Sequence, residues 1–103
     1  MSCSRNDVVL LPIPFTDLKS RKVRPAVVIG RSGADLFLAP VSSRFPNTDF
    51  ALKEWQAAGL NVPYGVKAQI ATVEEKLVIK TVGVLAPADR QLLDARLRVW
   101  LQL

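Results

Sequence analysis

Short runs of aliphatic and β-branched residues, bounded by prolines and polar turns, dominate the first half of the chain. Runs of this length are too short for helices and are typical of buried strands. The pattern predicts strands over Asp7–Ile13, Pro25–Arg31 and Asp35–Ser42. Because only a short turn at Ser32 and Gly33 separates the last two runs, we expect them to pair as an antiparallel hairpin.

The middle of the chain alternates between polar loops and further short apolar runs. Ser43–Thr48 is polar and predicts a loop, after which Asp49–Lys53 alternates as a half-buried strand does. Two more apolar runs, Gly65–Thr72 and Leu77–Leu85, predict strands. The polar segment Val73–Lys76 between them suits a single helical turn.

The last part of the chain changes from strand to helix periodicity. Pro87 suits the first residue of a helix, where its missing N–H is not needed, and Asp89 suits the positive end of the helix dipole. Four apolar residues then recur at helical spacing, namely Leu93, Leu97, Trp100 and Leu101. The chain therefore predicts a mostly β fold: a small, strongly bent antiparallel sheet or barrel with a C-terminal α-helix.

Length and composition narrow the class of protein. The chain has 103 residues, 50% of them hydrophobic, which fits a single domain over residues 1–103. No run approaches the roughly 18 apolar residues of a membrane span, so we expect no membrane partner. The apolar N-terminal run contains Asp7 and two prolines and lacks a small-residue cleavage site. It therefore lacks the features of a signal peptide, and we expect a cytoplasmic protein.

The residue types exclude most catalytic templates. There is no His for a Ser-His or Cys-His pair, and a lone Cys3 permits neither an intramolecular disulfide nor a structural zinc site. We expect Cys3 to lie in a mobile terminal segment as an incidental thiol. The five glycines are scattered singly, with no phosphate-binding loop. The sequence therefore predicts no structural zinc site and no cofactor, and it leaves carboxylates as the possible ligands of any other metal.

Positive charge concentrates between the first two predicted strands. The formal net charge is +5, and four cations stand close together: Lys19, Arg21, Lys22 and Arg24. A hairpin would bring Arg31 and Arg44 near this segment. Such a cluster attracts polyanions such as RNA, although a solvated loop has the same composition. The aromatic candidates for stacking on bases, which suit a core equally well, are Phe15, Phe45, Phe50, Trp55 and Tyr64.

Three stretches of the sequence resemble PemK/MazF-type toxins of bacterial type II toxin-antitoxin systems. The first, Asp7 to Gly30, reads DVVLLPIPFTDLKSRKVRPAVVIG, and its Arg-Pro strand is the most specific part. The second is APVSSRF, Ala39 to Phe45, and the third runs from Ala57 to Asp89. The resemblance therefore covers nearly the whole chain.

This resemblance implies an SH3-like β-barrel of the MazF/CcdB type with a C-terminal helix, usually dimeric. It also implies a metal-independent, sequence-selective endoribonuclease that cleaves single-stranded RNA until a cognate antitoxin protein blocks it. The family's catalytic Arg falls on Arg24 and its catalytic Thr on Ser42. The chain departs from the family in carrying Ser at that position and Arg44 where Gln is usual.

The chemistry of these residues agrees with that role. Attack of a ribose 2′-OH on the adjacent phosphorus builds negative charge on the phosphoryl oxygens, which the parallel N–H donors of Arg24 can stabilise. Ser42 can donate one further hydrogen bond. Because a guanidinium stays protonated, the base that takes the 2′-OH proton is left unassigned. The residues expected to contact RNA around this centre are Lys19, Arg21, Lys22, Ser43, Arg44 and Lys67.

Two other functions fit the same fold. The first is an SH3-like binding module for nucleic acid or protein that has lost the chemistry. The second is a toxin that binds DNA gyrase, as the related CcdB proteins do. Gyrase binding has no need of the pair formed by Arg24 and Ser42, and cleavage of RNA in EDTA separates both alternatives from a nuclease.

Overall fold

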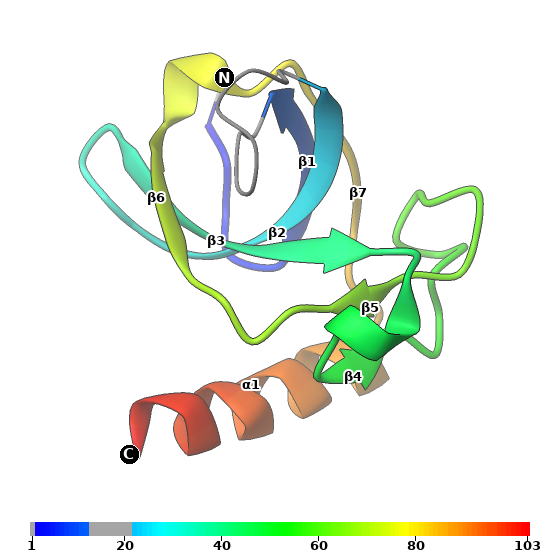
Figure 1. Cartoon of the computed structure of the whole chain (residues 1–103). Helices are drawn as coiled ribbons and strands as arrows, with labels where there is room; N and C mark the ends of the chain where they lie inside the picture. The colour runs from blue at the N-terminus through cyan, green and yellow to red at the C-terminus, as the bar shows by residue number, and fades with distance from the viewer. Residues whose placement is uncertain (1, 13–21) are drawn as a thin grey trace.

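A computed structural model describes residues 2–12 and 22–103. Within these residues, seven strands precede one α-helix: β1 (Asp7–Pro12), β2 (Val23–Ser32), β3 (Asp35–Ser42), β4 (Phe50–Ala51), β5 (Gly65–Val66), β6 (Ala71–Glu74), β7 (Lys80–Val84) and α1 (Pro87–Leu101). Two short 3-10 helices, η1 (Phe45–Asn47) and η2 (Glu75–Leu77), lie within the connections. The strands curl around one another and α1 lies across one side of the curved sheet (Figure 1). A bent antiparallel sheet with a C-terminal helix is the predicted architecture, and it is confirmed.

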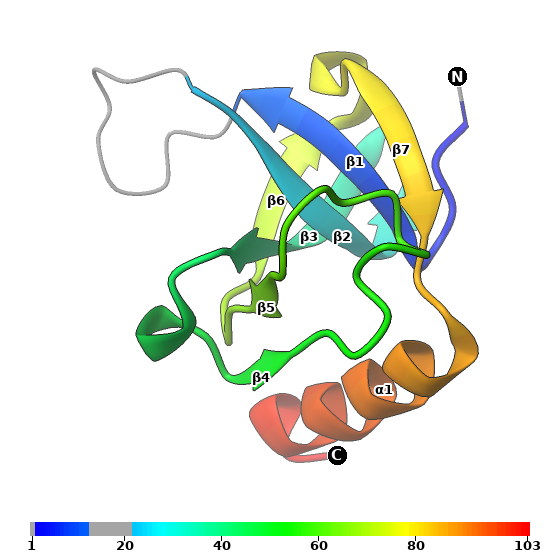
Figure 2. The same cartoon turned by 90° about the vertical axis from the view of Figure 1, so that its right-hand side faces the viewer.

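The sheet is organised around β3. Its strand order is β4-β5-β3-β2-β1-β7, and β6 also pairs with β3. β3 therefore pairs with β2 along one edge, and with β6 and then β5 along the other. The expected hairpin of β2 and β3 is present, with β3 at its predicted bounds. In Figure 2, β1 and β7 lie side by side in front of the barrel.

The expected single strand over Gly65–Thr72 is wrong, because the structure divides it into β5 and β6. Pro40 of β3 explains the break. Its carbonyl accepts a hydrogen bond from the Lys67 N–H at 2.9 Å, on the edge that faces β5 and β6. Proline has no N–H to return to that edge, so the ladder stops there. Residues 67–70 then leave the sheet before pairing resumes at Ala71.

Both faces of the central strands are buried, which accounts for their continuous apolar runs. On β2, Val27 belongs to a cluster that includes Leu93 and Leu97 of α1, whereas Ala26 and Val28 belong to a second cluster with Leu36 and Leu38 of β3. Successive side chains on a strand point to opposite faces. One face is therefore covered by α1, and the other fills the interior of the curled sheet.

Asp89 fastens α1 to the loop that follows β4. The residue is fully buried, and its two carboxylate oxygens accept hydrogen bonds from the backbone N–H groups of Lys53 and Glu54, both at 2.9 Å. The position of Asp89 in the first helical turn was predicted from the helix dipole. The structure adds a second role, because the same carboxylate satisfies two N–H groups outside the helix.

The expectation of a mobile N-terminal segment around Cys3 is wrong. Cys3 is buried, and its backbone N–H donates to Glu75 Oε2 at 2.7 Å. Arg31 completes the arrangement by donating to the Cys3 carbonyl at 3.0 Å and to both oxygens of Glu75. The segment is therefore held by a carboxylate and a guanidinium that lie 72 and 28 residues further along the chain. In the described part of the chain, no helix is long and apolar enough to cross a membrane.

Backbone contact between Gly83 and Ala58 makes a sharp test of the packing around β7. A Cβ on Gly83 would stand 2.5 Å from the Ala58 carbonyl carbon, whereas a Cβ on Gly30 would meet only the Phe37 ring, at 3.4 Å. We expect Gly83→Ala to lower the free energy of unfolding by about 2 kcal/mol or more, because backbone cannot yield as a ring can. Gly30→Ala should change it by less than about 0.5 kcal/mol. Urea denaturation measures both, and equal effects would contradict this packing.

The Glu75 contacts predict a dependence of stability on pH. Hydrogen bonds from Arg31 and from the Cys3 N–H lower the pKa of Glu75 from 4.5 to about 2. Between these values the unfolded chain binds more protons than the folded protein. The stabilisation is therefore complete above about pH 4.5 and is lost as the pH falls toward 2. The difference in unfolding free energy between wild type and Glu75→Gln should shrink between pH 6 and about pH 3.

Urea denaturation at a series of pH values follows this difference. Glu54→Gln is the matched control, because none of the ion pairs among the described residues involves Glu54. A wild-type advantage over Glu75→Gln that stays constant down to pH 3 would show that the Arg31 contacts contribute nothing through the charge of Glu75.

Candidate functional site

The antiparallel pairing of β2 and β3 brings the start of one strand to the end of the other. Ala26 pairs with Pro40. Continuing this register by two residues on each strand brings Arg24 level with Ser42. Arg24 also pairs with Leu11 of β1, so its backbone is held within the sheet while its side chain is exposed. The two residues expected to be catalytic therefore meet at one edge of the barrel.

A hollow of about 500 Å³ opens at this edge, and we name it the basic hollow. Six residues expected to act on RNA line it: Lys22, Arg24, Ser42, Ser43, Arg44 and Lys67. The remaining lining residues are Val23, Pro25, Val41, Asn47 and Tyr64. Lys19 and Arg21, the other two residues expected to contact RNA, lie outside the described residues.

The lining of the basic hollow is unbalanced in charge. Among the described residues, its lining holds four cationic side chains and no acidic one. The ion pairs found among the described residues involve Arg5, Arg31, Lys76 and Arg96, none of which lines the hollow. Within the same residues, no three His, Cys, Asp or Glu side chains gather as a metal site. The hollow is therefore suited to an anion that brings several negative charges.

Ser42 is held in a defined orientation within the basic hollow. Its hydroxyl oxygen accepts a hydrogen bond from the Arg44 backbone N–H at 3.0 Å. A hydroxyl that accepts in this way keeps its own proton free to donate. The side chain is half-buried, whereas those of Ser43 and Arg44 are exposed. Ser42 is thus the serine of this pair whose hydroxyl is fixed and can donate into the hollow.

The other candidates from the sequence lie in different places. Arg31 lies at the turn end of the hairpin and pairs with Glu75, so the expectation that it stands near the basic segment is wrong. Of the aromatic candidates, Tyr64 lines the basic hollow, while Phe50 and Trp55 pack against the core. Phe15 lies outside the described residues. Asn47 was missed, since a single Asn in a turn carries no signal that separates binding from loop geometry.

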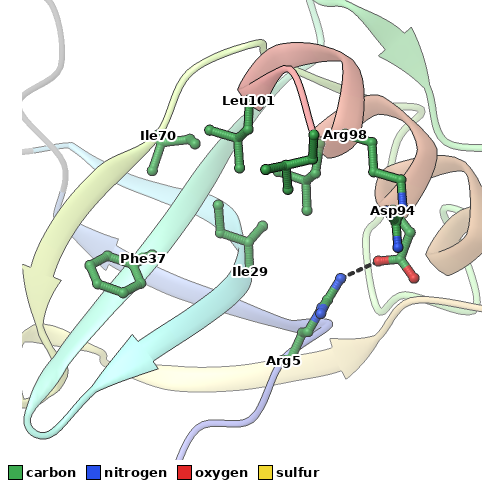
Figure 3. A pocket seen from close by; sticks show the side chains of 9 residues that line it. Arg5, Ile29, Phe37, Ile70, Asp94, Arg98 and Leu101 are labelled. Carbon is green, nitrogen blue, oxygen red and sulfur yellow. Dashed lines mark hydrogen bonds and ion pairs between the residues drawn. The ribbon is translucent and has the colours of Figure 1, made fainter.

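A second hollow, of about 430 Å³, lies between α1 and the sheet, and we name it the apolar hollow. Figure 3 shows Ile29 and Phe37 on the sheet, with Ile70 beside them and Leu101 of α1 facing them. Ile29 stands where the pairing of β2 with β3 shifts register. Arg5 and Asp94 form an ion pair at the rim. This lining offers contact area rather than groups for chemistry.

Two solved structures are similar to the chain over nearly its whole length. One is described as an endoribonuclease in complex with its cognate antitoxin from Mycobacterial species; it is 18% identical, has a TM-score of 0.75, and the match covers 98% of this chain and 94% of that chain. The other is Mycobacterium tuberculosis toxin MazF-mt6, which is 16% identical with a TM-score of 0.74, covering 94% of this chain and 97% of that one. Likeness at this identity shows the fold, and the expected MazF-like barrel is confirmed. No curated protein matches the sequence.

The sequence also matches the model of one protein family. That model describes the PemK-like, MazF-like toxin of type II toxin-antitoxin systems, and the match spans residues 4–101. Every residue that lines the basic hollow lies inside this range. The chain therefore belongs to the PemK-like, MazF-like toxins of type II toxin-antitoxin systems.

Proposed function

We propose that this toxin is an endoribonuclease that cleaves single-stranded RNA, messenger RNA included, in the basic hollow. The observation that carries the proposal is that Arg24 and Ser42 line one hollow, whose described lining has four cationic side chains and no acidic one. Family membership supports it, as does the fold shared with a protein described as an endoribonuclease. The protein acts in the cytoplasm, where its substrate is found.

The reaction begins with attack of the ribose 2′-oxygen on the neighbouring phosphorus. The new bond joins the 2′-oxygen to phosphorus, and the bond from phosphorus to the 5′-oxygen breaks. The 2′-OH gives its proton to a base that we leave unassigned, and the departing 5′-oxygen takes up a proton. The products are a 2′,3′-cyclic phosphate and a free 5′-OH, so the step consumes no water and needs no cofactor or metal ion.

Arg24 and Ser42 lower the barrier by binding the charge that develops during attack. Arg24 provides two parallel N–H donors toward the non-bridging phosphoryl oxygens. The Ser42 oxygen already accepts a hydrogen bond from the Arg44 N–H, so its hydroxyl donates a hydrogen bond to the same phosphoryl oxygens. Donors held in place before the reaction stabilise a transition state without a cost of reorganisation. This makes both of them catalytic residues.

The remaining polar residues of the hollow bind the RNA on either side of this phosphate. Lys22, Arg44 and Lys67 offer positive charge and Ser43 a hydroxyl, all within the same hollow. Lys19 and Arg21 belong to the same basic segment of the sequence and are assigned the same role. Phosphate contacts of this kind position the strand and carry no sequence information themselves.

A cognate antitoxin protein is the expected inhibitor, as the family's place in toxin-antitoxin systems indicates. A hollow whose described lining has several cations and no acidic side chain suits an acidic segment of such a partner as well as it suits RNA. Competition for one surface would explain how a protein of this family is kept inactive.

The protein is also proposed to form a homodimer through the apolar hollow. Side chains that line it are unusually exposed for their type, with Ile70 at 42% and Leu101 at 51%. The rim carries an acidic residue, Asp94, which pairs with Arg5, and a further basic residue, Arg98, which forms no ion pair with another described residue. A surface with an apolar centre and both signs of charge at its rim is complementary to a second copy of itself about a two-fold axis.

Substitution of Arg24 tests the proposed catalysis. Arg24→Lys keeps the charge but loses the planar pair of donors, so we expect it to slow cleavage on the order of 10²-fold or more, nearly as much as Arg24→Ala. Ser42→Ala should cause a comparable or smaller loss, and Ser43→Ala a much milder one. The measurement is single-turnover cleavage of a labelled RNA in EDTA, with circular dichroism to confirm folding.

Arg98→Lys makes the same chemical change at a site away from the basic hollow, and it should cleave as wild type does. Near wild-type cleavage by Arg24→Lys would reduce Arg24 to a point charge that binds phosphate. A wild type that leaves RNA intact but inhibits supercoiling by gyrase would overturn the proposed function altogether.

Two substitutions on α1 test the homodimer. Leu101→Glu places a charge in the apolar hollow and should weaken dimerisation by about tenfold or more. Val99→Glu is the matched control, because Val99 is similarly exposed at 57% but does not line the hollow. Sedimentation at micromolar concentration measures both. A wild type that sediments only as an 11.3 kDa monomer, or equal behaviour of the two variants, would contradict this interface.

A further inference from the structure

A third hollow, of about 430 Å³, continues the basic hollow along the surface. The two share Asn47 and Lys67, so a strand bound in one can extend into the other. On one side the third hollow is bounded by η1 and Asp49, and on the other by residues 67–69, which leave the sheet between β5 and β6. We name it the amide hollow, after the side chains of Asn47 and Gln69.

The amide hollow differs from its neighbour in charge. Its lining includes one cation, the shared Lys67, and one acidic residue, Asp49. Arg96 of α1 donates to both oxygens of Asp49, at 2.6 and 3.1 Å, and Trp100 Nε1 donates to Oδ2 at 2.9 Å. The hydrogen bond from Arg96 is the main reason that the pKa of Asp49 lies below its usual value. The surface is therefore nearly neutral, which suits an uncharged base better than a phosphate.

Asn47 and Gln69 offer hydrogen-bonding groups to such a base. Neither side chain forms a hydrogen bond with another described residue. A carboxamide presents a donor and an acceptor side by side, which pair with two neighbouring groups on the edge of a base. Thr48 is different, because its hydroxyl already donates to the Phe45 carbonyl at 2.7 Å. The two amides are therefore the neutral polar side chains of this hollow that remain available to a ligand.

The backbone around the amide hollow is held in place before anything binds. The Thr48 N–H donates to the Phe45 carbonyl at 2.9 Å, and the Asp49 N–H to the Val66 carbonyl at 2.8 Å. The opposite side is held where the Lys67 N–H reaches Pro40 of β3. Recognition groups on a fixed backbone discriminate between ligands better than groups on a mobile loop.

We propose that Asn47 and Gln69 are specificity-determining residues, which read one base next to the phosphate bound by Arg24 and Ser42. The inference rests on the proposed nuclease function. It assigns the binding of phosphate and the recognition of a base to two adjoining surfaces. The basic hollow holds phosphates and performs the chemistry, and the amide hollow selects a nucleotide by the edge of its base. The ligand of this subsite is a single unpaired nucleotide of an RNA strand.

Cleavage of a randomised single-stranded RNA library tests the assignment. The library is cut in EDTA under single-turnover conditions, and the new ends are sequenced to give the base preference at each position around the cut. Asn47→Ala and Gln69→Ala should each reduce the preference at one and the same position by about tenfold, while preferences elsewhere remain. Asn61→Ala and Gln91→Ala remove exposed amides that line neither hollow, and they should leave every preference unchanged.

The possible outcomes separate this inference from the function on which it rests. Active variants with an unchanged preference at every position would overturn the base-recognition subsite and leave the nuclease standing. A wild type that leaves the library intact would contradict the proposed function itself. Gln69→Glu, which keeps the shape and replaces the donor by an acceptor, repeats the test if Gln69→Ala fails to fold. It should change which base is preferred rather than the rate alone.

Discussion

β2 and β3 pair as antiparallel neighbours from Ser32 and Asp35 at their turn to Ala26 and Pro40 toward their open end. This register decides which side chains meet at the edge of the barrel, because a shift of one residue would send each of them to the opposite face. It brings Arg24 level with Ser42 without any loop having to close. The candidate site is therefore a property of the sheet itself, because the backbones of its two central residues belong to β2 and β3.

Pro40 extends the same constraint to the other half of the chain. Its carbonyl receives the Lys67 N–H, and its missing N–H ends the ladder there, so residues 67–70 leave the sheet. This departure places Lys67 in the basic hollow and Gln69 in the amide hollow. On the opposite side of the amide hollow, Arg96 and Trp100 of α1 hold Asp49 in place through hydrogen bonds to its carboxylate. A proline in one strand and an acidic residue in a loop thus shape the surface that RNA is proposed to follow.

The sequence was most informative where the local pattern of residues and the burial of the element in the fold point to the same structure. Continuous apolar runs identified β1, β2 and β3 because both faces of these strands are buried, and Pro87 marked the start of α1 correctly. It was least informative where contact with a residue far away in the sequence determines the local structure. The break between β5 and β6 depends on Pro40, and the burial of Cys3 depends on Glu75 and Arg31, which no local pattern connects to it. For the site, charge alone favoured a solvated loop over an RNA-binding one, and the family resemblance singled out Arg24 and Ser42.

The central claim is that Arg24 and Ser42 bind the phosphate of an RNA strand while its own 2′-oxygen attacks it. The most direct test is mass spectrometry of the fragment ends after cleavage by the wild-type protein in EDTA. The account predicts a 2′,3′-cyclic phosphate on the upstream fragment and a free 5′-OH on the downstream one, formed at the same rate with and without added divalent cations. Fragments that carry 5′-phosphates, or cleavage that requires a divalent cation, would contradict it.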